Sequence, residues 1–246
     1  LLRQSYKFRF KKSELRIAND PGNTPKDWDR YWAEQNNAET WGFYEKIAGF
    51  YRIKIIRPSL KAQLAKSFLP GERILHAGCG SGMVDTDVVG IYDITACDFS
   101  PQALAIYSNF FGERAKTVKA DLFESGFENA GFDGLYNLGV MEHFSASEMD
   151  KILKEFHRIL KPGGRIVLFW PPEFGLSVMV LRFVHFVLND ILGRNIHLHP
   201  AEPSRIKSRR QVRELLQKNG FKLERFDFGI HDLFTHAVVH AVRAEL

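Results

Sequence analysis

The chain has 246 residues, of which 45% are hydrophobic and 26% are charged. This balance supports a globular protein, and the length suits one α/β domain with appendages rather than two full domains. The net charge of +5 is a mild excess, which permits weak attraction to anionic partners but does not require nucleic acid. Cys79 and Cys97 fall in core-like contexts and no stretch reads as a signal peptide, so we expect a cytoplasmic protein.

Residues 1–69 are expected to form an arm and an aromatic-rich helical cap. In residues 1–19, aromatic and basic side chains alternate with the period of a strand, so this arm either packs on its own domain or a second subunit, or binds nucleic acid. Residues 26–57 look helical, with Trp28, Tyr31, Trp32 and Gln35 on one face. These aromatic residues either pack as core or cover a ligand cleft.

A proline is expected to end this helical region. Arg57-Pro58 is interpreted as its boundary. A separate short helix is predicted over residues 59–68, before the first strand.

The stretch from Arg73 to Gly82 joins the end of a strand to a glycine-rich turn. The apolar pair Ile74-Leu75 is typical of a buried parallel strand, and the glycines that follow let the backbone turn sharply. Such a turn presents backbone N–H groups and a helix N-terminus to a ligand. Alone it is a weak signal, because plain turns after strands often contain glycine.

Three further strand-like runs end in residues that suit a nucleotide site. The first reaches Asp98, about twenty residues after the first glycine of the turn, where dinucleotide-binding folds place the carboxylate that binds a ribose diol. The second ends in Asp121, and the third leads into Glu142-His143. Because the carboxyl ends of parallel strands meet at one edge of a sheet, we expect these residues to lie together.

Helix signals separate the strands. Ser100-Pro101 supplies an N-cap and a first-turn proline, and Ser145 with Glu148 predicts a capping box. Strands alternating with helices imply a mostly parallel sheet with right-handed crossovers. The remaining elements are strands over 165–170, 222–228 and 236–242 and a helix that starts at a second capping box, Ser208 with Gln211.

Five motifs carry a family resemblance: His76-Ala-Gly-Cys-Gly-Ser-Gly82, Ala96-Cys-Asp-Phe-Ser-Pro101, Lys119-Ala-Asp-Leu122, Asn137-Leu-Gly-Val-Met-Glu-His-Phe144 and Arg158-Ile-Leu-Lys-Pro-Gly-Gly-Arg165. Over roughly residues 70–243 the chain resembles the class I S-adenosylmethionine-dependent methyltransferases, especially their small-molecule branch. The resemblance implies an α/β, doubly wound, seven-stranded and mostly parallel sheet with a Rossmann-like methyltransferase fold, whose last strand is antiparallel. It also implies a domain over 70–246 that binds S-adenosyl-L-methionine.

The resemblance assigns roles to individual residues. The turn from Gly78 to Gly82 would hold the methionine part of the cofactor, Asp98 the ribose, and Phe99, Asp121 and Leu122 the adenine. The full set of expected cofactor-binding residues is Ala77, Gly78, Cys79, Gly80, Gly82, Asp98, Phe99, Asp121, Leu122 and Leu138. One position departs from the family: His76 stands where an acid is usual, which puts in question the contacts that this acid makes beneath the methionine end.

Residues 173–207 are expected to form a helical insertion after the fifth strand. Residues 174–192 are apolar nearly throughout, with one narrow polar stripe, and fall short of the ~20 apolar residues of a spanning helix. They form either a lid over an apolar acceptor, a helix lying on a membrane surface, or a helix buried against the domain or in a homodimer interface. His197, His199 and Glu202 match no standard zinc spacing, so no metal is predicted.

Methyl transfer from a sulfonium needs alignment of the acceptor and exclusion of water more than it needs a base. His143 is the candidate general base for a hydroxyl or an acidic carbon, and the alternative is a structural role in the cofactor pocket. We expect a small, apolar or lipid-, quinone- or phenol-like acceptor and a monomer or homodimer.

Two other functions stay open. A nucleic-acid methyltransferase fits the charge, although Asn137-Leu-Gly-Val stands where enzymes that methylate exocyclic amines usually carry Asn/Asp-Pro-Pro-aromatic. A non-catalytic cofactor-binding subunit is kept open by His76.

Overall fold

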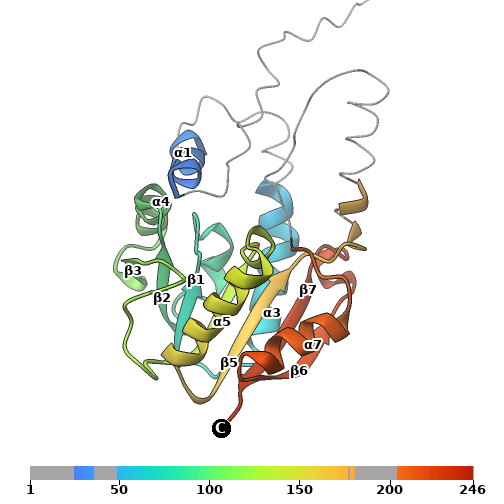
Figure 1. Ribbon diagram of the computed structural model, residues 1–246. Coiled ribbons are helices and arrows are strands. Elements are labelled where there is room, and N and C mark those ends of the chain that lie inside the picture. The colour runs from blue at the N-terminus through green and yellow to red at the C-terminus, as the bar shows by residue number, and fades with distance from the viewer. Residues whose placement is uncertain (1–24, 36–48, 177, 181–203, 246) are drawn as a thin grey trace, which may run out of the picture.

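The computed structural model describes residues 25–35, 49–176, 178–180 and 204–245. At its centre lies one seven-stranded sheet with the order β3-β2-β1-β4-β5-β7-β6 (Figure 1). The strands are β1 (Arg73–Ala77), β2 (Asp93–Asp98), β3 (Lys116–Lys119), β4 (Phe132–Leu138), β5 (Leu160–Trp170), β6 (Phe221–Asp227) and β7 (Ala237–Arg243).

The strand pairing explains where a ligand can bind. β1 pairs in parallel with both β2 and β4, so the chain order reverses direction across β1, which is the switch point at which open α/β sheets bind ligands. The pairs β2 with β3 and β4 with β5 are also parallel, whereas β7 runs antiparallel to β5 and β6. The predicted doubly wound sheet with an antiparallel last strand is confirmed.

Helices cover both faces of the sheet. On one face, α5 (Ala146–Ile159) and α7 (Arg209–Lys218) bury apolar side chains against the strands, and Figure 1 shows these two helices in front of the sheet. On the other face lie α3 (Arg57–Leu64), the 3-10 helix η3 (Met83–Asp87) and α4 (Pro101–Phe111). Each face therefore carries its own apolar core.

Two of the three predicted helix caps form as expected. Ser100 accepts a hydrogen bond from the backbone of Ala103, and Ser145 with Glu148 makes a reciprocal capping box. Ser208 also caps α7, but Gln211 accepts from the N–H of Lys207 instead of closing the box on Ser208.

The predicted helix boundary at Arg57-Pro58 is wrong. The helix runs on through Pro58, because the preceding segment η2 (Arg52–Ile56) is a π-helix. The N–H of Arg57 donates to the carbonyl of Arg52, five residues earlier, so the wider turn makes room for the proline in mid-helix. The result is one continuous helical segment over the described residues 49–64.

Several sequence predictions concern residues that the structure does not describe. The arm over residues 1–19, most of the expected insertion, and His197, His199 and Glu202 lie outside the described residues. At the start of the insertion, Leu176 and residues 178–180 are helical.

None of the described helices has the length and apolar run that crossing a bilayer requires. The described residues also contain no cluster of three or more His, Cys, Asp or Glu side chains suited to a metal ion.

Candidate active site

The glycine turn after β1 is pinned to the end of β2. The N–H groups of Gly78 and Cys79 both donate to the carbonyl of Cys97 at 2.9 Å. The N–H of Gly80 donates to Asp98 Oδ2 at 3.0 Å. These bonds set the turn directly above the carboxyl end of β2, as the spacing of the motifs predicts.

Asp98 is the central carboxylate of this edge. It is only 7% exposed, and its other oxygen accepts from the N–H of Ser100 at 3.0 Å. Burial raises the pKa of Asp98, while the N–H groups of Ser100 and Gly80 oppose that shift. Because each carboxylate oxygen can accept more than one hydrogen bond, Asp98 can also accept from the two hydroxyls of a ribose diol.

Helix α1 (Pro25–Gln35) is anchored above the turn. Asp29 accepts from the hydroxyl of Ser100 at 2.6 Å and from the N–H of Gln102 at 3.4 Å, so its negative charge sits at the N-terminus of α4. From this anchor Trp32 reaches the turn, where a Cβ atom on Gly80 would lie 2.6 Å from its ring. The sequence had singled out this aromatic face but not its partners.

The residues expected at the adenine end follow β2 and β3. Phe99 is half-buried and Leu122 is buried, whereas Asp121 is exposed and accepts from the N–H of Phe123 at 2.9 Å. The N–H of Ala120 donates to the carbonyl of Asp98, which holds the two strand ends side by side.

His143 lies at the end of a short 3-10 helix, η5 (Met141–His143), that follows β4. Its ring is half-buried and meets Trp28 of α1 edge to face, with 4.9 Å between ring centroids. Helix α1 therefore contacts both the glycine turn and the candidate base, so it bridges the loops that follow β1 and β4.

His76 is fully enclosed beneath the turn. Its Nδ1 lies 2.6 Å from Asp85 Oδ2, and both side chains are buried. Tyr107 donates to the same carboxylate oxygen at 2.7 Å, and the ring of Tyr136 stacks on His76 at 4.2 Å between centroids. A carboxylate is thus present beneath the turn, but it comes from η3 rather than from β1.

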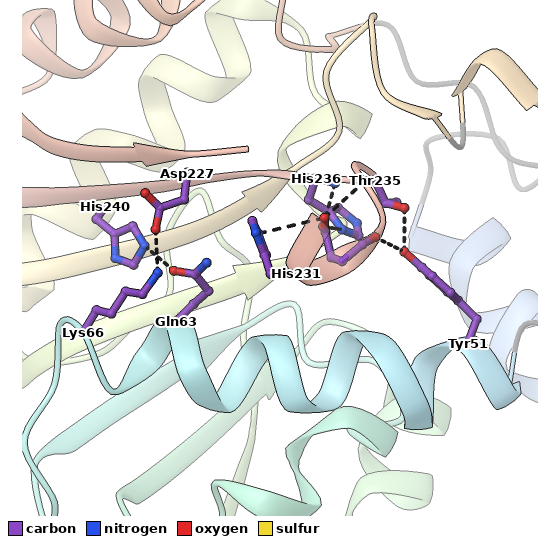
Figure 2. A network of polar contacts seen from close by, with 9 residues as sticks. Tyr51, Gln63, Lys66, Asp227, His231, Thr235, His236 and His240 are labelled. Carbon is purple, nitrogen blue, oxygen red and sulfur yellow. Dashed lines mark hydrogen bonds and ion pairs between the residues drawn. The ribbon is translucent and has the colours of Figure 1, made fainter. Parts of the chain in front are cut away.

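A second polar network joins the helix before β1 to the loop between β6 and β7 (Figure 2). The buried carboxylate of Asp232 accepts from the N–H groups of Thr235 and His236 and lies 3.0 Å from His236 Nδ1. The hydroxyl of Tyr51 donates to the carbonyl of Asp232 and lies 2.5 Å from the hydroxyl of Thr235. No sequence signal marked this network, because its members are more than 180 positions apart.

Deeper along β7, His240 contacts the end of α3. Its Nδ1 lies 2.7 Å from Ser67 Oγ, and its Nε2 lies 3.1 Å from Gln63 Oε1. Figure 2 shows His240 beside the ion pair of Lys66 with Asp227. Burial lowers the pKa of His240 to about 4, so this side chain is neutral at pH 7.

The match to known families agrees with this geometry. Residues 75–168 match the family model described as "Methyltransferase domain", a range that includes the glycine turn, both strand-end acids and His143. These residues therefore form a methyltransferase domain of the class I, S-adenosylmethionine-dependent type. Its cofactor is therefore S-adenosyl-L-methionine.

Relatives of this methyltransferase act on different classes of acceptor. It is 27% identical to an O-methyltransferase of Penicillium expansum over 62% of this chain and 61% of that protein. It is 29% identical to a sterol 4-C-methyltransferase of Caenorhabditis elegans over 45% of this chain and 35% of the relative. It is also 29% identical to a probable tRNA methyltransferase of Mus musculus over 42% of this chain and 23% of the relative. The chain thus covers less than two thirds of each relative.

A solved structure shares the fold. Magnesium protoporphyrin IX methyltransferase of Synechocystis PCC 6803, solved with S-adenosylhomocysteine, superposes with a TM-score of 0.62 at 20% identity, covering 89% of this chain and 95% of that one. At this identity the likeness concerns the fold alone.

The structure brings the predicted site residues to one edge of the sheet. Ala77 ends β1 and the glycine turn follows it. Asp98 ends β2 and Phe99 follows it, while Leu138 ends β4. Asp121, Leu122 and His143 follow at the same edge. The individual contacts of these residues with the cofactor stay a prediction. The residues that the sequence did not single out as site residues are Asp29, Asp85, Tyr107, Asp232 and His236.

Proposed function

We propose that this methyltransferase transfers a methyl group from S-adenosylmethionine to a small apolar acceptor of lipid, quinone or phenol type. The observation that carries the proposal is a group of exposed apolar side chains at the same edge of the sheet as the candidate site. We call it the apolar rim. Its members are Phe174, Leu176, Met179, Val180, Ile230, Leu233 and Phe234, each between 41% and 77% exposed.

The rim is built from two segments that meet. The N–H of Leu176 donates to the carbonyl of Phe234 at 2.9 Å, and Phe228 contacts the rings of both Phe174 and Phe234. Leu233 and Phe234 adopt left-handed backbone angles, with φ of 57° and 58°. Such angles are uncommon outside glycine, and residues held in them cluster at functional sites.

The position of the rim favours contact with the acceptor. One segment leaves the end of β5 and the other leads into β7, where Trp170 pairs with Ala237. This is the same edge of the sheet at which the glycine turn lies. Contiguous exposed apolar surface commonly marks a ligand or interaction site, so the rim suits an apolar acceptor held next to the methyl donor.

The chain's own residues have three tasks in the reaction. When bound, the cofactor supplies a methyl group on a positively charged sulfur, so the leaving group needs no further activation. Helix α1 and the apolar rim exclude water and align the acceptor, which is the main requirement of an in-line displacement. His143 accepts the proton when the acceptor is a hydroxyl or an acidic carbon.

Transfer of a labelled methyl group tests this function. The protein is incubated with methyl-tritiated S-adenosylmethionine and separate lipid, quinone, phenol and RNA fractions. We expect label in an apolar fraction, lost when Ile230 and Phe234 are replaced by serine. Leu69→Ser serves as the matched control, because Leu69 is 70% exposed but precedes β1 at the opposite edge of the sheet. Label in RNA alone, with the rim variant fully active, would contradict the proposal.

A second candidate is methylation of RNA. It is favoured by the relative named as a tRNA methyltransferase and by the net charge of +5. The RNA arm of the same experiment, repeated at rising salt concentration, separates this candidate from the first. Binding of RNA through phosphate contacts weakens steeply with salt, whereas binding of an apolar acceptor does not.

A further inference from the structure

We propose that Asp85, held by His76 and Tyr107, is the positioning residue that sets the glycine turn for the methionine end of the cofactor. The inference rests on the proposed binding of S-adenosylmethionine and deepens it. The methyltransferase departs from its family at His76, and the structure shows a carboxylate in contact with that imidazole, which belongs to a residue nine positions later.

The first step concerns the connection between Asp85 and the turn. The N–H of Asp85 donates to the carbonyl of Gly82 at 2.9 Å, so the last glycine of the turn is bonded directly to this residue. The same glycine packs on Tyr107, because a Cβ atom at Gly82, whose φ is +65°, would lie 2.3 Å from the ring. Tyr107 in turn donates its hydroxyl to Asp85. Asp85 thus holds Gly82, the last residue of the turn, both directly through a backbone hydrogen bond and indirectly through Tyr107.

The second step concerns burial. The Asp85 side chain is 0% exposed and that of His76 is 2% exposed, so the carboxylate has no access to bulk water. Burial and the nearby charge of Asp85 raise the pKa of Tyr107, which keeps its hydroxyl a hydrogen-bond donor. A buried carboxylate that loses one of two such donors is destabilised strongly, because no solvent replaces the bond.

The third step concerns a further partner of the carboxylate. Burial, the charge of Asp85 and a hydrogen bond to Asp85 together raise the pKa of Tyr136, so this buried hydroxyl also faces the carboxylate. His76 stacks on the Tyr136 ring and bonds to Asp85, so it ties β1, β4 and η3 together directly below the turn. The carboxylate therefore gathers His76, Tyr107 and Tyr136 beneath the turn, which an apolar side chain at position 85 could not do.

Binding of S-adenosylhomocysteine, measured by calorimetry, tests the inference. We expect Asp85→Asn to weaken binding about tenfold to a hundredfold, the effect of losing one charge-assisted hydrogen bond. His76→Asp should weaken binding further, since it places two carboxylates next to each other. The exchanged pair, His76→Asp with Asp85→His, should recover binding to within about threefold of the wild type, because the charges and the contact return.

Two variants separate positioning from general loss of structure. Tyr107→Phe removes a single hydroxyl and should weaken binding even if Asp85→Asn fails to fold. Asp87→Asn is the matched control on the same 3-10 helix, since Asp87 pairs with Arg57 near the surface, and it should bind like the wild type. The amide NMR shifts of Gly80 and Gly82 should move in Tyr107→Phe and not in the control.

Each outcome decides one question. Folded Asp85→Asn and Tyr107→Phe proteins that bind within twofold of the wild type would overturn the inference. So would an exchanged pair that is folded but binds no better than Asp85→Asn. A wild-type protein that does not bind S-adenosylhomocysteine would instead refute the proposed function.

Discussion

The indole ring of Trp32 lies against the backbone of Gly80. A Cβ atom on this glycine would come within 2.6 Å of Trp32 Cζ2, and its φ of +51° is one that other residues rarely adopt. The contact joins an N-terminal helix to the turn that is expected to hold the cofactor's methionine part. Any ligand at this turn therefore shares its surroundings with α1.

The contact predicts a coupled effect of two substitutions. Gly80→Ala should weaken S-adenosylhomocysteine binding by roughly 1–3 kcal/mol, because the new Cβ strains the backbone and pushes Trp32 away. Trp32→Ala alone should weaken binding less, and in the double variant part of the loss from Gly80→Ala should disappear. Calorimetry of the four proteins gives the coupling energy. Strictly additive effects would show that α1 does not bear on the bound cofactor.

Cofactor affinity should depend on pH through Asp98. The ribose hydroxyls donate to an ionised carboxylate, and burial raises the pKa of Asp98 above the ordinary aspartate value. Affinity should therefore be full at neutral pH and fall as the pH drops through this raised pKa, earlier than for an exposed aspartate. Binding measured from pH 8 downwards checks the trend.

The matched variant for this trend is Asp98→Asn. It should bind more weakly by roughly 1–3 kcal/mol at neutral pH and show a flatter pH profile, since the amide does not titrate. If the affinity of the wild type depended on pH as weakly as that of the variant, Asp98 would not be the residue that binds the ribose.

Kinetic measurements can distinguish a catalytic role of His143 from a structural one. If it accepts the acceptor's proton, His143→Gln should lower kcat by about 10²-fold or more while S-adenosylhomocysteine affinity changes little. The acidic limb of the pH–rate profile should also vanish. A purely structural role through its packing on Trp28 would instead reduce cofactor binding and leave the shape of the profile intact.

His240 should make the fold sensitive to acid. Its pKa is about 4 in the folded protein, whereas the unfolded chain takes up this proton near pH 6.5. The unfolded state therefore binds more protons between these values, and stability falls as the pH drops from 6.5 towards 4, by an amount on the order of 2–3 kcal/mol. Urea unfolding at pH 7.5, 6 and 5 measures this slope.

A variant isolates the contribution of this histidine. His240→Gln is expected to be less stable at pH 7.5, because the contacts with Ser67 and Gln63 change, but to lose less stability on acidification. An unchanged slope in the variant would assign the acid sensitivity to other groups.

The sequence by itself determined the fold class of this protein and the edge of the sheet at which its candidate site lies. The strand-end positions of Asp98, Asp121 and Glu142-His143 follow from local patterns, because apolar runs fix the strands and parallel connections bring their carboxyl ends to one edge. The caps at Ser100 and Ser145 are equally local, since a side-chain oxygen needs only the N–H groups of the next turn. Such signals are readable without knowledge of the packing.

Only the tertiary structure decided which side chains complete the site. Trp32 meets Gly80, and Asp29 meets Ser100, across separations that no periodicity records. Asp85 reaches His76 because a 3-10 helix turns it under the glycine loop, and the helix passes through Pro58 because a π-helical turn precedes it. These outcomes depend on packing and on the satisfaction of buried polar groups, which are properties of the assembled core rather than of any one segment.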